Sequence, residues 1–285
     1  MAAESREAEL QQAGMAACPF QTAALTSAGG RAHNEDSCGF RMNGDTGCWV
    51  LCDGLGGHRG GEIASRLAVD AALASFESDA RVSMDVLGTH LNQAHRAVLE
   101  RQSSEPELAG MRTTMVMLVA STEAAVWAHA GDSRLYWFRD GALREQTRDH
   151  SVPQRLADAG EICADQIRFH EDRNRLLRSL GGKGEAGAAT PLTATGTMPG
   201  APQPGDAFLL ASDGFWEWVI ESEMQQDLAD SSRPEQWLER MESRIRERAN
   251  MNHEMDHDGD HDNYSALAVM WPAVPGPAIM GEDAA

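Results

Sequence analysis

The most constraining feature of this sequence is the stretch at residues 49–65, which reads WVLCDGLGGHRGGEIAS. An apolar run typical of a β-strand ends at Asp53, glycines then crowd the loop, and a helical pattern follows. Glycine adopts left-handed backbone angles and leaves room for close approach. We therefore expect Asp53 and the Gly54 carbonyl to form the floor of a site.

Two other interpretations of this loop have to be weighed. A dinucleotide-binding loop requires G-x-G-x-x-G, and here Gly54 and Gly56 fit while Arg59 occupies the third glycine position. A glycine-rich turn with an exposed aspartate is common and needs no ligand. The choice depends on whether the rest of the chain supplies matching features.

Length and charge limit the function classes. The chain has 285 residues and 42% hydrophobic content, enough for one large domain or two small ones with an ample core. A formal net charge of −20 argues against binding to nucleic-acid phosphates and to anionic membranes. An acidic chain can still act on phosphates if cations intervene, because clustered carboxylates bind hard metal ions.

Cysteine usage and the absence of targeting signals favour a cytoplasmic location. The five cysteines are odd in number and lack C-x-x-C spacing, so they predict neither a disulfide framework nor a zinc site. We recognise no signal peptide and no apolar run as long as a membrane span. We expect residues 1–17 to be a flexible lead-in and residues 273–285 a disordered tail.

The periodicity of apolar residues predicts mixed secondary structure with antiparallel strands. Strands are expected at residues 20–26, 38–42, 48–52, 113–120, 124–130, 135–138, 207–212 and 264–271. Helices are expected at residues 62–76, 86–101, 153–159 and 232–248, with another from about residue 223. We also expect His90 and His95 to lie at the surface or rim of the second helix, and residues 160–173 to form a mobile surface flap.

Acidic residues recur where predicted apolar strands meet small or polar residues. These acids are Asp53, Asp132, Asp213 and Asp262, and Glu35 and Asp36 add two more. If the strands pack as antiparallel sheets, their ends can converge, and several carboxylates in one cleft repel one another unless divalent cations bridge them. Two such ions lower the pKa of a bridging water, and a neighbouring arginine can bind a phosphate. Phosphate ester hydrolysis is the resulting hypothesis.

A calcium-binding loop is excluded for the acidic run at residues 256–262. Its sixth position, which needs glycine, is His261, and its twelfth, which needs glutamate, is Leu267. Only Asp262, at the edge of the last strand, is a good ligand candidate.

Five blocks occur in order: RAHNED, DGLGGH, GDSR, SDGFW and DN. Over about residues 20–271 the sequence resembles the metal-dependent serine/threonine protein phosphatases of type 2C, the PPM family, in their bacterial form. The resemblance implies an α+β fold, a four-layer α-β-β-α sandwich of two antiparallel sheets flanked by helices. It also implies that residues 18–272 form a single catalytic domain with two Mn²⁺ or Mg²⁺ ions in a cleft at one edge.

The same resemblance implies roles for the ligands of these two ions. By position, Asp53 would bridge both metals and the Gly54 carbonyl would bind the second. Asp213 and Asp262 would hold the first metal.

The resemblance also implies roles for residues around the two-metal centre. Glu35 and Asp36 would act largely through metal-bound waters. Asp132 matches the ligand of a third, weaker metal seen in similar enzymes. Arg31 would bind the substrate phosphate.

The sequence departs from the family pattern at two positions. Members of eukaryotic type carry a histidine, a proposed general acid, directly after the Asp-Gly pair, and here that residue is Leu55. His58 lies three positions further on, so protonation of the leaving oxygen by a metal-bound water is the expectation. The family's Gly-Thr-Thr strand start appears with Arg112 in place of the glycine.

The expected reaction is hydrolysis of phosphoserine or phosphothreonine in proteins by attack of a metal-bridging hydroxide, without a covalent intermediate. The alternative is a non-catalytic, metal-binding regulator of the same fold that recognises phosphoproteins. A phosphatase with an aspartyl nucleophile would need D-x-D-x-T, which DGLGG lacks. We expect a monomer acting on protein substrates of a bacterial Ser/Thr kinase pathway, without nucleic-acid or membrane partners.

Overall fold

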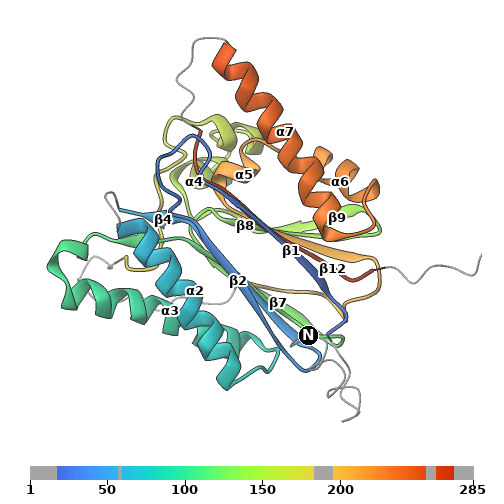
Figure 1. Cartoon of the computed structure of the whole chain (residues 1–285), viewed down its shortest axis with the longest axis horizontal. Helices are drawn as coiled ribbons and strands as arrows, with labels where there is room; N and C mark the ends of the chain where they lie inside the picture. The colour runs from blue at the N-terminus through green and yellow to red at the C-terminus, as the bar shows by residue number, and fades with distance from the viewer. Residues whose placement is uncertain (1–17, 57–59, 183–194, 255–260, 273–285) are drawn as a thin grey trace, which may run out of the picture.

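The computed structural model describes residues 18–56, 60–182, 195–254 and 261–272. Two five-stranded antiparallel sheets pack against each other, and helices cover their outer faces (Figure 1). The predicted four-layer α-β-β-α sandwich is confirmed. The expected lead-in at residues 1–17, the expected tail at residues 273–285 and His58 lie outside the described residues.

Sheet A has the strand order β1-β12-β11-β8-β9 and contains both the first and the last strand of the chain. Every neighbouring pair is antiparallel. Its strands are β1 (Gln21–Ser27), β12 (Tyr264–Met270), β11 (Asp206–Ala211), β8 (Arg134–Arg139) and β9 (Ala142–Gln146). The nearly continuous apolar sequence of β11 and β12 reflects burial on both faces.

Sheet B has the strand order β10-β7-β6-β3-β2, again antiparallel throughout. Its strands are β10 (Gly196–Thr197), β7 (Ala125–Ala130), β6 (Met115–Ala120), β3 (Thr46–Cys52) and β2 (Ser37–Asn43). All seven residues of β3 are buried, so the strand that carries the chain to Asp53 lies within the core.

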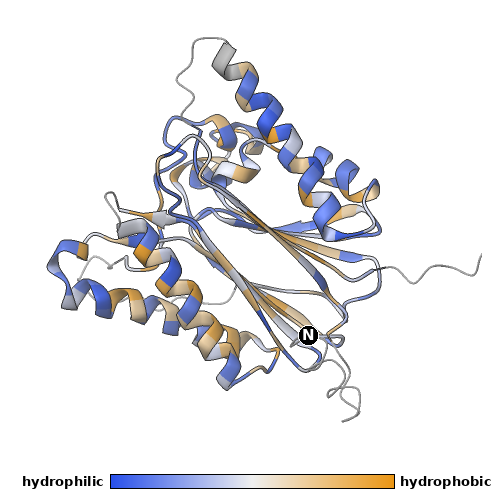
Figure 2. Cartoon of the chain, viewed as in Figure 1, coloured by the Kyte–Doolittle hydropathy of each residue, from blue (hydrophilic) through white to orange (hydrophobic). Residues whose placement is uncertain are grey.

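Three apolar layers hold the sandwich together. Between the sheets, side chains including Trp49, Trp127 and Phe208 form the central layer. The helices α2 (Gly60–Ser78) and α3 (Met84–Ser104) bury a second layer against sheet B. The helices α5 (Asp213–Trp216), α6 (Glu221–Ala229) and α7 (Pro234–Glu254) bury a third layer against sheet A. Figure 2 shows α7 to be mostly hydrophilic, as expected of a helix that buries one side only.

A short ladder interrupts the predicted strand at residues 113–120. The strand β4 (Gly54–Leu55) pairs with β5 (Arg112–Thr113), and β6 begins only after Thr114. The break occurs because the two threonines at residues 113 and 114 bond to Asp53 rather than continuing the sheet B ladder.

The connection between β9 and β10 contains short helices. They are α4 (Val152–Asp158) and the 3₁₀ helix η2 (Ala164–Phe169), and a further 3₁₀ turn, η1 (Pro106–Leu108), follows α3. The Ser151 hydroxyl accepts the Gln154 amide and so caps the N-terminus of α4. Phe169 is 80% exposed at the end of η2, within the segment expected to form a surface flap.

The prediction that His90 and His95 lie at the surface or rim is wrong. Both are buried, because α3 lies between α2 and the chain around residue 181. The Nδ1 atom of His90 is 2.8 Å from the Ser75 hydroxyl, and the Gly181 amide donates to Nδ1 of His95 at 3.1 Å.

Strand register brings the acidic segments to one edge of the sandwich. In sheet A, the end of β1 pairs with the start of β12, and the end of β11 pairs with the start of β8. In sheet B, the end of β3 pairs with the start of β2, and the end of β7 with the start of β6. The loops that leave these strand ends therefore face one another. No helix in the described part of the chain is both long and apolar enough to cross a membrane.

Candidate active site

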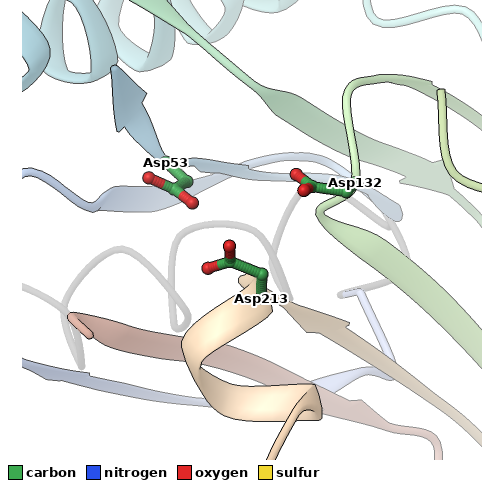
Figure 3. Close-up of side chains that lie close together, drawn as sticks. All are labelled: Asp53, Asp132 and Asp213. Atoms are coloured by element: carbon green, nitrogen blue, oxygen red, sulfur yellow. The ribbon is translucent and has the colours of Figure 1, made fainter. Parts of the chain in front are cut away.

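Three carboxylates from distant parts of the chain meet at this edge. Oxygen atoms of Asp53, Asp132 and Asp213 all lie within 4.8 Å of one another. Figure 3 shows the three side chains pointing toward a common space, Asp53 from the end of β3, Asp132 from the β7–β8 turn and Asp213 from the start of α5. The expectation that strand-end acids converge is therefore confirmed for these three residues.

Asp53 is fixed by the β5–β6 segment. The Asp53 amide donates to the Thr114 hydroxyl at 2.9 Å. Its carbonyl accepts the Thr114 amide at 2.8 Å and the Thr113 hydroxyl at 2.7 Å. With both backbone polar groups bonded, the carboxylate is held at the end of a buried strand.

Asp213 is positioned by the turn between β11 and α5. The Gly214 amide donates to the Asp213 carboxylate at 2.6 Å. A Cβ atom on Gly214 would overlap the Asn263 carbonyl oxygen, so glycine is required for the turn to pack on the start of β12. The local structure thus depends on both residues of the Asp-Gly pair: the aspartate accepts the Gly214 amide, and the glycine leaves room for the Asn263 carbonyl.

Asp132 lies in a turn held from several sides. Gly131 has a positive φ of 107°, and the Ser133 hydroxyl lies 2.7 Å from that of Thr114. The indole N–H of Trp216 donates to the Asp132 carbonyl at 3.0 Å. The turn therefore connects the chain around Asp53 with helix α5.

The segment at residues 149–150 supports the same turn. The His150 amide donates to the Gly131 carbonyl at 2.8 Å, and the Gly131 amide donates to Nδ1 of His150 at 3.3 Å. The His150 ring stacks on His129 with centroids 4.4 Å apart. Asp149 accepts two hydrogen bonds of 2.8 Å from the buried Arg134, whose guanidinium lies 3.4 Å from the centroid of the Trp216 ring.

His150→Ala is expected to weaken divalent-metal binding roughly 10-fold, because removing the support of a ligand typically costs 10- to 100-fold in affinity. Calorimetric titration with Mn²⁺ measures the change. His150→Asn should restore part of the affinity, since its amide oxygen can accept the Gly131 N–H. His170→Ala is the matched control, because among the described residues the His170 ring bonds only to the Asp172 amide. An unchanged titration for His150→Ala would contradict the positioning role.

A cavity of about 190 Å³ contains the three carboxylates. The predicted site residues that line it are Arg31, Glu35, Asp53, Gly54, Asp132, Asp213 and Asp262. Asp262 lies outside the group of three, and it accepts from the Arg31 guanidinium at 3.4 Å. Arg31 is thus placed at the mouth of the acidic cavity.

Asp36, the remaining predicted residue, does not line the cavity. It is 9% exposed, and one carboxylate oxygen accepts the Ser212 hydroxyl at 2.9 Å. Its other oxygen, Oδ1, is buried without a hydrogen-bond partner among the described residues. Such an orphaned acceptor is costly unless a further donor or a cation serves it.

Burial and mutual repulsion raise the pKa of these acids. Burial is the largest cause for each, and neighbouring carboxylates add to it. The pKa of Asp213 rises to about 6 and that of Asp36 to about 7, and the pKa values of Asp53 and Asp132 rise well above their usual range. The negative charge of these carboxylates is therefore poorly compensated by other groups of the protein.

Several residues of the site were not identified from the sequence. Asn263 accepts the Glu35 amide at 2.8 Å and donates to two carbonyls of the β1–β2 loop, and so holds that loop on β12. Asn174 and Leu176 complete the cavity wall. Glu217 lies near Asp213, and burial raises its pKa to about 7 although Arg173 bonds it at 2.8 Å. Of these residues, only Asn263 belongs to a block recognised in the sequence, the DN block.

The donor set fits hard divalent cations. Five carboxylate side chains line the cavity, and among the described residues neither cysteine nor histidine does. Such a set suits Mg²⁺ or Mn²⁺ rather than softer metals. The raised pKa values and the orphaned Asp36 oxygen are both features that bound cations would relieve.

Comparison with known proteins agrees with this geometry. The family model for protein phosphatase 2C matches residues 28–257. The chain is 34% identical over 209 residues to the serine/threonine phosphatase stp of Listeria welshimeri, covering 71% of this chain and 80% of that protein.

Solved structures give the same result. The serine/threonine phosphatase PstP/Ppp of Mycobacterium tuberculosis superposes with a TM-score of 0.71 at 29% identity, covering 89% of this chain and 99% of that one. The catalytic domain of PstP in complex with two manganese ions gives 0.70 at 29% identity, covering 88% and 97%. The chain therefore belongs to the protein phosphatase 2C family.

Proposed function

We propose that this protein is a metal-dependent phosphatase that hydrolyses phosphoserine and phosphothreonine in proteins. The observation that carries the proposal is the convergence of Asp53, Asp132 and Asp213 within 4.8 Å in a cavity that also holds Arg31. Family membership and the two manganese ions in the PstP complex support the same conclusion.

We assign the metals to the carboxylate cavity. Asp53, Gly54, Asp213 and Asp262 all line it, and the Gly54 carbonyl would serve as a ligand beside the three carboxylates. An oxygen of Asp132 lies within 4.8 Å of oxygens of both Asp53 and Asp213, which supports the assignment of Asp132 to a third ion beside the other two. Glu35 borders the cavity and Asp36 lies beneath it, which suits contact through water.

When bound, two such ions supply Lewis acidity and make hydroxide available near neutral pH. Arg31 would bind the phosphate oxygens, since its guanidinium lies at the cavity and is about half exposed. The ion pair with Asp262 orients that guanidinium. Leu55, which lines the cavity, has no proton to donate, so the leaving serine oxygen must receive its proton from elsewhere.

We further propose a cytoplasmic monomer that opposes a bacterial Ser/Thr kinase. The support is the bacterial origin of relatives named serine/threonine phosphatases. The substrates would be phosphorylated proteins, because a cavity of about 190 Å³ is large enough for a phosphoryl group and would leave the rest of the substrate outside it.

The test is phosphate release from phosphoserine and phosphothreonine peptides and from p-nitrophenyl phosphate, with Mn²⁺, with Mg²⁺ and with EDTA. We expect turnover with metal, none in EDTA and no acid-stable phosphoenzyme. Turnover that persists in EDTA would contradict the metal-dependent reaction. Tight phosphopeptide binding without turnover would instead identify the protein as a non-catalytic regulator of the same fold.

A further inference from the structure

Arg112 lies beside the cavity and takes no part in the site described above. It is an exposed residue of β5, directly opposite Leu55 of β4. Within the described residues Arg112 forms no ion pair, in contrast to Arg31. A guanidinium at this position is available to a substrate.

The ladder geometry fixes the direction of the Arg112 side chain. Opposite residues of an antiparallel pair lie on the same face, with Cβ atoms about 5 Å apart. The other pair, Gly54 and Thr113, faces the interior, where Thr113 is fully buried and a Cβ on Gly54 would overlap the Gly61 carbonyl. Arg112 and Leu55 therefore share the outer face, and Leu55 lines the cavity.

The position of Arg112 relative to Asp53 is also fixed. The next two residues, Thr113 and Thr114, hold the Asp53 backbone through three hydrogen bonds. A Cβ on Gly56 would lie 3.0 Å from the Gly110 carbonyl oxygen, so the glycine loop packs closely on the chain before Arg112. The backbone that carries Arg112 is thus held beside the cavity rather than on a free loop.

Electrostatics indicate what this arginine selects. Among the residues that the structure describes, five carboxylates and one arginine line the cavity, in a chain of net charge −20. Bound cations would neutralise the centre, while the surrounding protein would still repel an acidic substrate. Arg112 supplies a local positive charge at the rim, where charged groups act mainly on association and on partner choice.

We propose that Arg112 selects substrates with an anionic side chain within two positions of the phosphorylated residue. Leu55 is two residues from Asp53 along the chain, and two residues of an extended peptide span about 6.6 Å. In an extended substrate, a side chain two positions from the phosphorylated residue projects to the same side as that residue. With the phosphoryl group in the cavity, this side chain would lie about as far from it as Leu55 lies from Asp53. The inference rests on the proposed phosphatase function and adds a sequence preference to it.

The test compares phosphoserine peptides that differ only in one flanking residue. One series places Asp at position −2, −1, +1 or +2, a neutral series places Asn there, and another peptide carries a second phosphoserine. We expect kcat/KM to be about two- to five-fold higher for the best Asp peptide than for its Asn counterpart, the effect of an exposed ion pair. The preference should vanish in Arg112→Gln and in about 0.5 M NaCl.

Arg96→Gln, which removes an exposed arginine from α3, is the matched control and should keep the preference. Turnover of p-nitrophenyl phosphate, which has no flanking residues, normalises each variant. A preference found only with the second phosphoserine would support an anion site that takes phosphate rather than carboxylate.

Two results would overturn the inference. One is equal kcat/KM for all peptides with the wild-type protein. The other is an Arg112→Gln variant that slows every substrate, including p-nitrophenyl phosphate, by the same factor. Both differ from failure of the proposed function, in which the wild-type protein with Mn²⁺ hydrolyses none of the peptides.

Discussion

Asp213→Asn is expected to lower kcat for phosphopeptide hydrolysis by about 10²- to 10⁴-fold. Asp213 lies within 4.8 Å of Asp53 and Asp132, so its loss removes one of the charges that hold the ions. Metal ions contribute several kcal/mol to stabilising transition-state charge, and each 1.36 kcal/mol corresponds to a factor of ten in rate. Steady-state kinetics over a range of Mn²⁺ concentrations measure the loss.

The same variant should be more stable than the wild-type protein when no metal is present. Burial and repulsion raise the pKa of Asp213 to about 6, so its ionised form destabilises the metal-free fold at pH 8. Removing that charge should raise the free energy of unfolding by about 2–3 kcal/mol in EDTA. The Asn side-chain oxygen can still accept the Gly214 amide, so the turn should persist.

Asp70→Asn is the matched control, because Asp70 is an exposed acid on α2 away from the cavity. It should change neither kcat nor stability in EDTA. An Asp213→Asn variant that is both less stable in EDTA and inactive would indicate a folding defect. Wild-type kcat in Asp213→Asn would show that this carboxylate does not serve the reaction.

The stability of the metal-free protein is expected to fall as pH rises from about 6.5 to 8.5. A carboxyl group whose pKa is raised by folding stabilises the protein while protonated, and that stability is lost as pH rises through the folded-state value. Asp36 and Glu217 both have a pKa of about 7, so both ionise in this window. From Asp36 alone the loss is about 2 kcal/mol, or a decrease in Tm of about 4–8 °C.

The window starts at about pH 6.5 because the buried histidines act in the opposite direction below it. Burial lowers the pKa of His129 and lowers that of His150 to about 3, so the unfolded chain binds more protons there. Thermal unfolding in EDTA across the window measures the slope. Excess Mn²⁺ should reverse it, since metals bind the deprotonated ligands. A Tm in EDTA that stays constant or rises would contradict the raised pKa values.

Local sequence patterns predicted the strands and helices well because each pattern depends on near neighbours. The predicted strand at residues 48–52 and the helix at residues 62–76 correspond to β3 and α2 within two residues at each end. Strand β9 and helix α5 were not predicted. Two other differences depend on distant contacts. The strand break at Thr114 depends on Asp53, and the burial of His90 and His95 depends on Ser75 and Gly181.

Part of the site could also be predicted from local sequence patterns. Asp53, Asp132 and Asp213 each follow a buried strand, which the sequence shows directly. Glu217 and Asn174 were missed because neither stands at a strand end or in a characteristic motif. Their position in the site results from how α5 and the segment before β10 pack against the cavity.

The sequence alone determined the longer strands and helices and their order, the acidic character of the site and the resemblance to a protein family, because these depend on residue identity and spacing. Only the tertiary structure decided which acids share a cavity, that Asp36 is buried outside it and that Arg112 pairs with the cavity residue Leu55. The physical reason is strand register, since pairing between distant strands sets which strand ends meet and which face each side chain occupies.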